Sequence, residues 1–483
     1  MIVLSDVFRG VQTTPHPHET TFANPTDAQR QVTTVAIDSR LAVRGALFVA
    51  LVGARVDGHL FVDAAARAGA DYALVDAHKG ESLSSEHGWT IVSPGGVVPT
   101  TWHGPLLIAV PDPLHALHQL ARWHRARYQP QWVVGITGSV GKTSTKEVVG
   151  ALLQTHLTTL KSPRSYNSES TLPLVALELT ATHQAAVFEM GMYATGEIAL
   201  LADIARPNIG VVTAIGPSHL ERMGSIAAIA AAKAELVQAL PTTGVAVLNR
   251  DDDRVYAMRA QTAARVMSYG LHADADVRAS DIRTHGIHGT TFVVTAPGIH
   301  AEVLLRAPGI HQVRNLLAGI AVGVVAGVPW ARMAHAIAHD IEQLRFVVRQ
   351  GISNTQIIDD AYNAAPTSMQ AALELLATVP ARRVAVLGDM RELGHIEVDA
   401  HHVVGRHAAH AADVLVAVGD RGAWIADGAR QAGMTAVYTA TDTLAAIPMV
   451  QSVLQAGDCV LVKGSRAMEM ERIVAACCID FTV

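Results

Sequence analysis

The sequence contains little cysteine, no excess of positive charge and no membrane-spanning run. Three of its 483 residues are cysteines, and Cys459, Cys477 and Cys478 lack the spacing of a metal-binding motif. Adjacent cysteines rarely pair with each other, so we expect reduced thiols, as in a cytoplasmic protein. Acidic residues (43) outnumber basic ones (37). A polyanion-binding surface is therefore not expected, and neither is a nucleic-acid partner.

The most hydrophobic stretch, residues 316–330, is shorter than the ~20 residues that a spanning helix needs, and Pro329 interrupts it. It predicts a buried helix and no membrane contact. Asp6 and Arg9 lie where a signal peptide would have its apolar core, so we do not expect export. The protein is predicted to be cytoplasmic.

Histidine is frequent, with 24 residues. Four of them lie in the segment H-H-V-V-G-R-H-A-A-H, at positions His401, His402, His407 and His410. No cysteine or carboxylate cluster completes a metal-ligand set there. We interpret these histidines as the solvent-exposed face of a helix.

The pattern of apolar runs predicts an α/β fold in three domains, because 483 residues exceed a single core. Residues 1–128 predict a small N-terminal α/β domain. In residues 129–344, strand patterns end in glycine or polar residues where helical patterns begin, which predicts a central, doubly wound and mostly parallel sheet. Residues 276–306 within it predict antiparallel strands. Residues 345–483 predict a Rossmann-like α/β domain, although no G-x-G-x-x-G follows its first strand.

One glycine-rich loop predicts a phosphate site. The segment G-I-T-G-S-V-G-K-T-S, residues 135–144, follows a strand pattern and precedes a helical one. Backbone N–H groups at such a helix N-terminus favour anionic oxygens. Lys142 supplies a positive charge, and the Thr143 hydroxyl suits Mg²⁺. Because the usual first glycine is replaced by Ile136, this P-loop is not that of common GTPases or motor ATPases.

Two charged or polar side chains follow later strand patterns. Glu189 ends the run A-A-V-F-E, and His219 lies just past the run I-G-V-V-T. A carboxylate at the end of a buried strand is costly unless it meets a cation. Each residue alone has an ordinary structural explanation. Together with Lys142, they predict one metal–phosphate site.

The motifs T-G-S-x-G-K-T, E-M-G-M, I-G-P-x-H-L-E and A-K-x-E-L, in this order, resemble those of the Mur ligase family, ATP-dependent amide-forming enzymes of bacterial cell-wall synthesis. Residues 38–59 look like the family's uridine-binding domain. Residues 357–373, 384–394 and 460–474 resemble the member that adds D-alanyl-D-alanine. The resemblance covers residues 32 to 474.

The resemblance implies a reaction. The carboxylate of UDP-N-acetylmuramoyl-tripeptide would attack the γ-phosphate of ATP, giving an acyl phosphate and ADP, and the amine of D-alanyl-D-alanine would then displace phosphate. Residues 1–128 would bind the UDP-sugar, the central domain would bind ATP with Mg²⁺, expected as two ions, and the last domain would bind the dipeptide. We expect a monomer whose partners are these small molecules.

The resemblance also implies roles for individual residues. The catalytic set would be Lys142, Glu189, His219, Lys233 and Arg345. ATP would contact Gly138, Ser139, Gly141, Lys142, Thr143, Ser144, His311, Asn315, Arg345 and Asp360. Mg²⁺ would bind Thr143, Glu189, His219 and Lys233, the last as a carbamate formed with CO₂. The other substrates would contact Ser39, Arg40, Asn167, Tyr362 and Asn363.

Some positions depart from the family pattern. Gln312 stands where asparagine is usual, Val140 replaces a polar loop residue, and Ala365 interrupts an Asn-Ala-Asn-Pro run. The segment near the sugar side differs at Ser168, Ser170 and Thr171. The predicted catalytic lysines and metal ligands are all present, so we predict an active enzyme.

Two alternatives remain. Another ligase on the same fold, such as a folylpolyglutamate or cyanophycin synthetase, would not need the uridine-like segment at residues 38–59. A catalytically silent nucleotide-binding scaffold protein would not need the complete metal–phosphate set.

Overall fold

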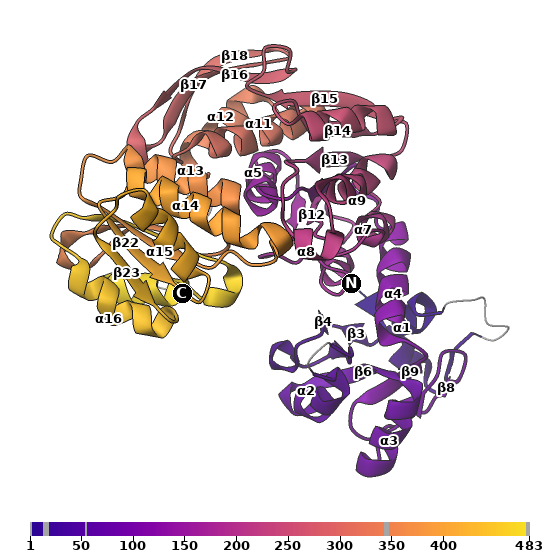
Figure 1. Ribbon diagram of the computed structural model, residues 1–483. Helices are drawn as coiled ribbons and strands as arrows, with labels where there is room; N and C mark the ends of the chain where they lie inside the picture. Colours follow the sequence, from indigo (N-terminus) through magenta and orange to yellow (C-terminus); the bar gives the residue numbers. More distant parts are fainter. Residues whose placement is uncertain (1, 13–18, 54–55, 342–346, 480–483) are drawn as a thin grey trace. The chain divides into compact units, whose positions relative to one another are not determined.

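A computed structural model describes residues 2–12, 19–53, 56–341 and 347–479 (Figure 1). Strands and helices alternate along the chain, which confirms the predicted α/β class. Two compact units form. The first comprises Met1–Gly135, Thr158–Met190 and Ala199–Pro207, and the second comprises Ile136–Leu157, Gly191–Ile198 and Asn208–Val483. The division into domains after residues 128 and 344 stays a prediction.

A parallel five-stranded sheet forms the core of the N-terminal part. Its strands, in order across the sheet, are β4 (Val35–Ala36), β5 (Ala46–Val49), β6 (Ala70–Asp76), β9 (Leu106–Val110) and β7 (Ile91–Val92). Helix α2 (Val62–Ala68) packs on it through Val62 and Ala65, which join one cluster with Phe48. Helix α4 (Pro113–Arg127) begins after Asp112, whose carboxylate accepts the first N–H groups of the helix.

The largest sheet has nine strands. They are, in order, β11 (Thr159–Lys161), β12 (Ala185–Glu189), β10 (Trp132–Thr137), β13 (Ile209–Val212), β14 (Val245–Asn249), β15 (Arg265–Gly270), β16 (Val277–Thr284), β17 (Thr290–Ala296) and β18 (Ile299–Leu305). The pairs from β13 to β16 are parallel. The pairs from β16 to β18 are antiparallel. The predicted antiparallel strands at 276–306 therefore extend this same sheet.

Two buried helices pack together beside this sheet. Helix α5 (Lys142–Gln154) follows β10, and α11 (Ile310–Val325) packs against it. A Cβ at Gly319 would lie 2.4 Å from Cγ1 of Val148, so glycine permits the close approach. The burial of α11 confirms the buried helix predicted for residues 316–330. Among the described residues, no helix has the length and apolar character needed to cross a membrane.

The C-terminal sheet is doubly wound. Its strands, in order, are β19 (Val347–Gln350), β20 (Gln356–Asp360), β24 (Cys459–Lys463), β21 (Arg383–Gly388), β22 (Val414–Val418) and β23 (Val437–Ala440). All pair in parallel except β19. Ile358 faces a cluster with α13 (Pro366–Ala377), α14 (Glu397–Ala411) and α15 (Gly422–Gln431). Its neighbour Ile357 faces α16 (Thr443–Val453) and α17 (Glu471–Cys477). Helices thus cover both faces, as predicted (Figure 1).

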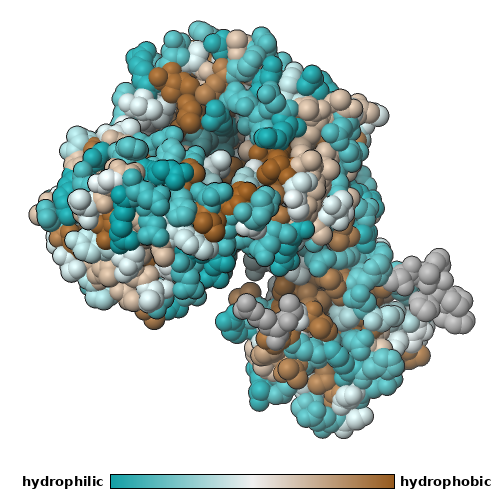
Figure 2. Space-filling view, viewed as in Figure 1, coloured by the Kyte–Doolittle hydropathy of each residue, from teal (hydrophilic) through white to brown (hydrophobic). Residues whose placement is uncertain are grey.

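Short elements complete the chain. Two small sheets pair β1 (Ile2–Val3) with β3 (Gln31–Val32) and β2 (Thr21–Phe22) with β8 (Val97–Val98). The remaining α-helices are α1 (Leu4–Gly10), α3 (Ala77–His87), α6 (Leu172–Leu177), α7 (Glu197–Ala205), α8 (Leu220–Met223), α9 (Ile226–Gln238), α10 (Asp253–Ala257) and α12 (Trp330–His339). Hydrophilic side chains predominate on the face that Figure 2 shows. Large hydrophobic residues exposed in the described N-terminal part are Leu41, Val43, Val52, Val56, Leu60, Phe61 and Val97.

The interpretation of the α14 histidines as a solvent-exposed face is wrong for His401, which is fully buried. Its Nε2 accepts the N–H of Met390 at 2.9 Å, and its Nδ1 lies 2.6 Å from the carbonyl of Glu397. Burial lowers the pKa of His401. The side chain therefore anchors the loop after β21, a tertiary contact that helical spacing does not reveal. His407 and His410 are exposed, as expected.

Candidate functional site

The loop between β10 and α5 is tied to the segment that follows β13. The N–H of Ser139 donates to the carbonyl of Ala214 at 2.8 Å. The Ser139 hydroxyl donates to the carbonyl of Gly216 at 3.0 Å and accepts its N–H at 2.9 Å. The hydroxyl of Thr213 donates to the carbonyl of Val140 at 2.6 Å. The hydroxyls of Ser139 and Thr213 thus satisfy backbone groups that have no partner in a regular helix or strand.

Two glycines of this loop have positive φ, 150° at Gly138 and 84° at Gly141. A Cβ at Gly138 would lie 1.9 Å from Oγ1 of Thr213, and one at Gly141 would lie 2.9 Å from Oδ1 of Asn315. Neither position has room for a side chain. Gly141 is the N-cap of α5, so the first N–H groups of that helix lie at the loop, where anionic oxygens are favoured.

Two lysines belong to this region. Nζ of Lys142 donates to the carbonyl of Gly138 at 2.8 Å, which folds the side chain back over the loop. Lys233, in α9, is only 1% exposed. Burial, with a smaller contribution from the charge of Lys142, lowers the pKa of Lys233 well below its ordinary value. Lys233 forms no hydrogen bond or ion pair with any residue that the structure describes. Its environment therefore favours the neutral amine.

The first compact unit contains the predicted carboxylate. Glu189 is the last residue of β12 and is 1% exposed. Its Oε1 accepts a hydrogen bond from Nδ2 of Asn167 at 2.8 Å. The predicted sugar-side residue Asn167 therefore contacts the predicted metal-binding carboxylate directly.

His219 precedes α8 in a left-handed conformation, with φ 61°. Its Nδ1 forms a short contact with the carboxylate of Glu392, in the loop after β21. The hydrogen bond from His219 lowers the pKa of Glu392. No sequence motif indicates a role for Glu392, because nothing in the strand and helix pattern brings residue 392 to residue 219.

The start of α11 carries the predicted adenine-side residues. Burial lowers the pKa of His311 to about 4, and the positive charge of Lys463 adds to the effect. Nδ1 of His311 is buried and has no hydrogen-bond partner among the residues that the structure covers. Nδ2 of Asn315 donates to Oε1 of Gln312 at 3.1 Å. The longer Gln312 side chain, which departs from the family pattern, thus holds Asn315.

The strand ends β20 and β24 bring Asp360 opposite Lys463 in register. Nζ of Lys463 donates to Oδ2 of Asp360 at 2.6 Å and to the carbonyl of Asn363 at 2.9 Å. Lys463 is buried and was missed, because only the pairing of β20 with β24 places it there. Tyr362 is 37% exposed, and the guanidinium of Arg466 lies 5.4 Å from its ring centroid.

The N-terminal part contains a cavity of about 1230 Å³. Ser39 and Arg40 line it, as do Glu169 and Ser170 from the segment beside Asn167. Arg40 forms an ion pair with Asp38 at 2.6 Å. Residues of the predicted uridine-side segment and of the predicted sugar-side segment therefore line one cavity.

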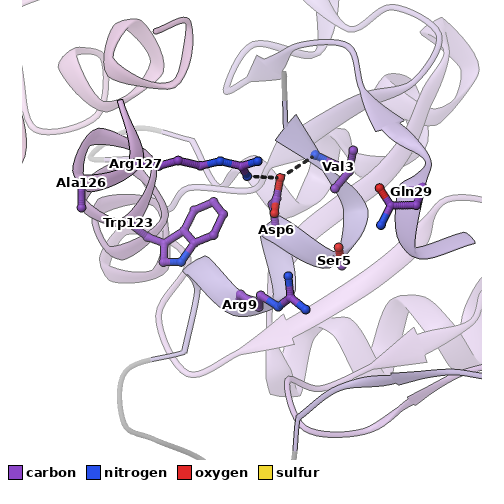
Figure 3. A pocket seen from close by; sticks show the side chains of 8 residues that line it. All are labelled: Val3, Ser5, Asp6, Arg9, Gln29, Trp123, Ala126 and Arg127. Atoms are coloured by element: carbon purple, nitrogen blue, oxygen red, sulfur yellow. Dashed lines mark hydrogen bonds and ion pairs between the residues drawn. The ribbon is translucent and has the colours of Figure 1, made fainter. Parts of the chain in front are cut away.

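A second cavity, of about 580 Å³, lies where α1 faces α4 (Figure 3). The carboxylate of Asp6 accepts the N–H of Val3 at 3.2 Å and Nη1 of Arg127 at 3.1 Å. These contacts join Asp6 in α1 to Arg127 in α4.

Two predictions, the role of Arg345 and the metal site, are not tested by the geometry. Arg345 lies outside the described residues. Within the described part of the chain, no group of three or more His, Cys, Asp or Glu side chains is placed to hold a metal ion. The predicted ligand set contains only two residues of those types, Glu189 and His219.

Three family models match the chain. "Mur ligase family, catalytic domain" matches residues 31–125, "Mur ligase middle domain" matches 136–323, and "Mur ligase, glutamate ligase domain" matches 344–466. The chain belongs to the Mur ligase family, which confirms the resemblance drawn from the motifs.

Similar proteins cover nearly the whole chain. The UDP-N-acetylmuramoyl-tripeptide--D-alanyl-D-alanine ligase of Mycobacterium bovis is 37% identical over an alignment of 496 positions, gaps included, which covers 95% of this chain and 95% of the relative. The crystal structure of MurF from Acinetobacter baumannii has a TM-score of 0.77 and 30% identity, covering 93% of this chain and 95% of that one. The MurF ligase from Thermotoga maritima in complex with ADP has a TM-score of 0.72 and 26% identity, covering 92% and 96%.

Proposed function

We propose that this chain is an ATP-dependent ligase that joins D-alanyl-D-alanine to UDP-N-acetylmuramoyl-tripeptide, releasing ADP and phosphate in peptidoglycan synthesis. The observation that carries the proposal is the match to a ligase of that name at 37% identity over 95% of both chains. The ADP complex of the Thermotoga maritima relative supports the use of ATP.

ATP binds, in this proposal, at the loop before α5. Lys142 and the loop residues Gly138, Ser139 and Gly141 contact its phosphates, together with Thr143 and Ser144. The positive φ values of the two glycines and the anchoring of Ser139 support a rigid cradle for anionic oxygens. A rigid cradle needs little reorganisation when charge develops on the phosphates.

The adenine and ribose contacts form a second part of the proposal. We assign the adenine to His311 and Asn315, the ribose to Asp360, and a phosphate contact to Arg345. The buried Nδ1 of His311 has no partner among the residues that the structure describes, which supports a ligand there, because buried polar atoms are rarely left unsatisfied.

The donors present fit Mg²⁺, which prefers oxygen ligands. Glu189 offers a buried carboxylate and Thr143 a buried hydroxyl, and we assign these to one ion and His219 to a second. Lys233 would contribute once its neutral amine adds to CO₂, forming a carbamate N–C bond and releasing one proton. Its lowered pKa supports that step. When bound, Mg²⁺ would neutralise charge on the phosphates.

The reaction then depends on positioning. Lys142 withdraws charge from the γ-phosphate while the tripeptide carboxylate attacks it, and the acyl phosphate forms as ADP leaves. The amine of D-alanyl-D-alanine attacks the acyl carbon, loses a proton and expels phosphate. Held in place, the two substrates react as if in one molecule.

The other substrates are assigned by domain. We propose that residues 1–128 bind the UDP-sugar through Ser39 and Arg40, with Asn167 near its peptide. The cavity of about 1230 Å³ lined by Ser39 and Arg40 supports this assignment. ATP belongs to residues 129–344, and the dipeptide belongs to residues 345–483, through Tyr362 and Asn363.

Phosphate release from ATP tests the function. We expect release only when UDP-N-acetylmuramoyl-tripeptide and D-alanyl-D-alanine are both present, with a tripeptide-plus-dipeptide product by mass spectrometry. Release that depends on a folate or on an aspartate–arginine polymer would favour the alternative ligases. ATP binding without turnover under any condition would favour the scaffold alternative.

The cytoplasmic location and the monomeric state stay predictions. Size-exclusion chromatography with light scattering tests the monomeric state.

A further inference from the structure

The loop after β21 meets the start of α8 at two residues in unusual backbone conformations. His219 has φ 61° and Glu392 has φ 66°, a region that residues with a Cβ rarely adopt. Their side chains are in short contact, Nδ1 to carboxylate. The N–H of Glu221 lies 3.4 Å from the carbonyl of Glu392, and a Cβ at Gly394 would lie 3.1 Å from Cα of Glu221. The two backbones are therefore closely packed around this one side-chain contact.

A second side chain fixes the orientation of the His219 ring. The ring of Tyr193 lies 4.8 Å from it, centroid to centroid, with an interplanar angle of 73°. The guanidinium of Arg222 lies 4.9 Å from the Tyr193 ring centroid. The imidazole is thus held by a carboxylate at Nδ1 and by an aromatic ring beside it.

The carboxylate determines which nitrogen of His219 carries the proton. A carboxylate accepts, so Nδ1 must donate, and the neutral imidazole then has its lone pair on Nε2. This is the arrangement by which proteins prepare a histidine for a metal ion: a carboxylate accepts the N–H of one nitrogen and the other binds the metal.

We propose that Glu392 is a positioning residue of the ligase reaction, which holds His219 in the tautomer and orientation that bind a divalent cation. This inference rests on the function proposed above. His219 belongs to the segment matched by the middle-domain model, and Glu392 to the segment matched by the glutamate ligase domain model. The C-terminal segment therefore supplies a part of the cation site that the middle segment alone lacks.

Cation binding to variants of Glu392 tests the proposal. The probe is Mn²⁺, titrated into the full-length protein with a non-hydrolysable ATP analogue, with free Mn²⁺ measured by electron paramagnetic resonance. We expect Glu392→Ala to weaken Mn²⁺ binding by roughly 10- to 100-fold. Glu392→Gln should weaken Mn²⁺ binding less, because its amide oxygen still accepts the Nδ1–H of His219. Glu374→Ala, which removes an exposed carboxylate of α13, should bind Mn²⁺ like the wild type.

Wild-type affinity in Glu392→Ala, or equal losses in the alanine and glutamine variants, would overturn the proposal. Nucleotide binding by the Glu392 variants without metal should be unchanged, which distinguishes a weakened cation site from a damaged fold. If Glu392→Ala does not fold, ¹⁵N-histidine spectra of the wild type and His219→Gln decide instead. The histidine signal that is present in the wild type and absent from His219→Gln should be that of an Nδ1–H tautomer. If that signal is of an Nε2–H tautomer, the proposal is overturned. None of these readouts needs turnover, so they are independent of the substrate test.

Discussion

Replacing Gly138 by alanine tests whether the loop before α5 owes its shape to the close contact with Thr213. The φ of 150° at Gly138 is one that L side chains rarely adopt, and the new Cβ would lie 1.9 Å from Oγ1 of Thr213. That hydroxyl is not free to move, because it donates to the carbonyl of Val140 at 2.6 Å. Gly138→Ala must therefore displace either Thr213 or the loop itself.

The magnitude follows from three effects. Backbone strain costs roughly 1–2 kcal/mol, the lost Thr213 hydrogen bond about 1 kcal/mol, and overpacking roughly 1–3 kcal/mol. Because relaxation relieves part of each, we expect a combined cost of about 3 kcal/mol. If the loop changes its conformation, this cost corresponds to a roughly 100-fold weaker affinity for ATP. If the surrounding core is distorted instead, the cost appears as a lower free energy of unfolding.

Calorimetric titration with a non-hydrolysable ATP analogue and chemical denaturation measure the two outcomes on the same variant. Gly216→Ala is the matched control, because its Cβ would meet nothing closer than Cβ of Ser139 at 3.7 Å. We expect the control to bind and unfold like the wild type. A Gly138→Ala protein with both wild-type affinity and wild-type stability would refute the account of the loop.

Three further predictions concern single side chains. Lys142→Ala should keep the fold and lose about 100- to 1000-fold in turnover, measured as phosphate release, because it removes a charge from the transferring phosphate; activity within a few-fold of wild type would contradict its role. Lys233→Ala should lose activity that formate or acetate partly restores, and no loss would reject the carbamate. The pKa of His311 is lowered to about 4 in the folded protein. As pH falls from 6.5 towards 4, the imidazole of His311 therefore takes up a proton in the unfolded chain before it does so in the folded protein. The free energy of unfolding should drop over that range by roughly 1–3 kcal/mol more in the wild type than in His311→Asn, and equal slopes in chemical denaturation would contradict the burial of the imidazole.

Much of the fold follows from local pattern. Short apolar runs that end in glycine or a polar residue predicted strands such as β10, β12 and β13, because a strand buried on both faces needs continuous apolar residues. The loop before α5 was found in the same way, since glycines and Lys142 between a strand and a helix have few structural alternatives. The antiparallel strands at 276–306 were also predicted, but their continuity with the parallel sheet was not.

The residues that were missed depend on tertiary contacts. Lys463 follows an ordinary strand pattern, and only the register of β20 against β24 makes it the partner of Asp360. Glu392 contacts a residue 173 positions away. His401 was misinterpreted because helical spacing shows which residues share a face, but not which loop that face contacts. Sequence periodicity does not predict such contacts between elements that lie far apart in the chain.

In the proposed reaction, ATP activates the tripeptide by phosphorylating its carboxylate. Isotope transfer tests this directly, with UDP-N-acetylmuramoyl-tripeptide labelled with ¹⁸O in both oxygens of that carboxylate and with D-alanyl-D-alanine present. An acyl phosphate requires one ¹⁸O atom to leave with the released phosphate and the other to remain in the new amide carbonyl. We predict phosphate carrying one ¹⁸O for each amide formed. Amide formation with unlabelled phosphate would contradict the account.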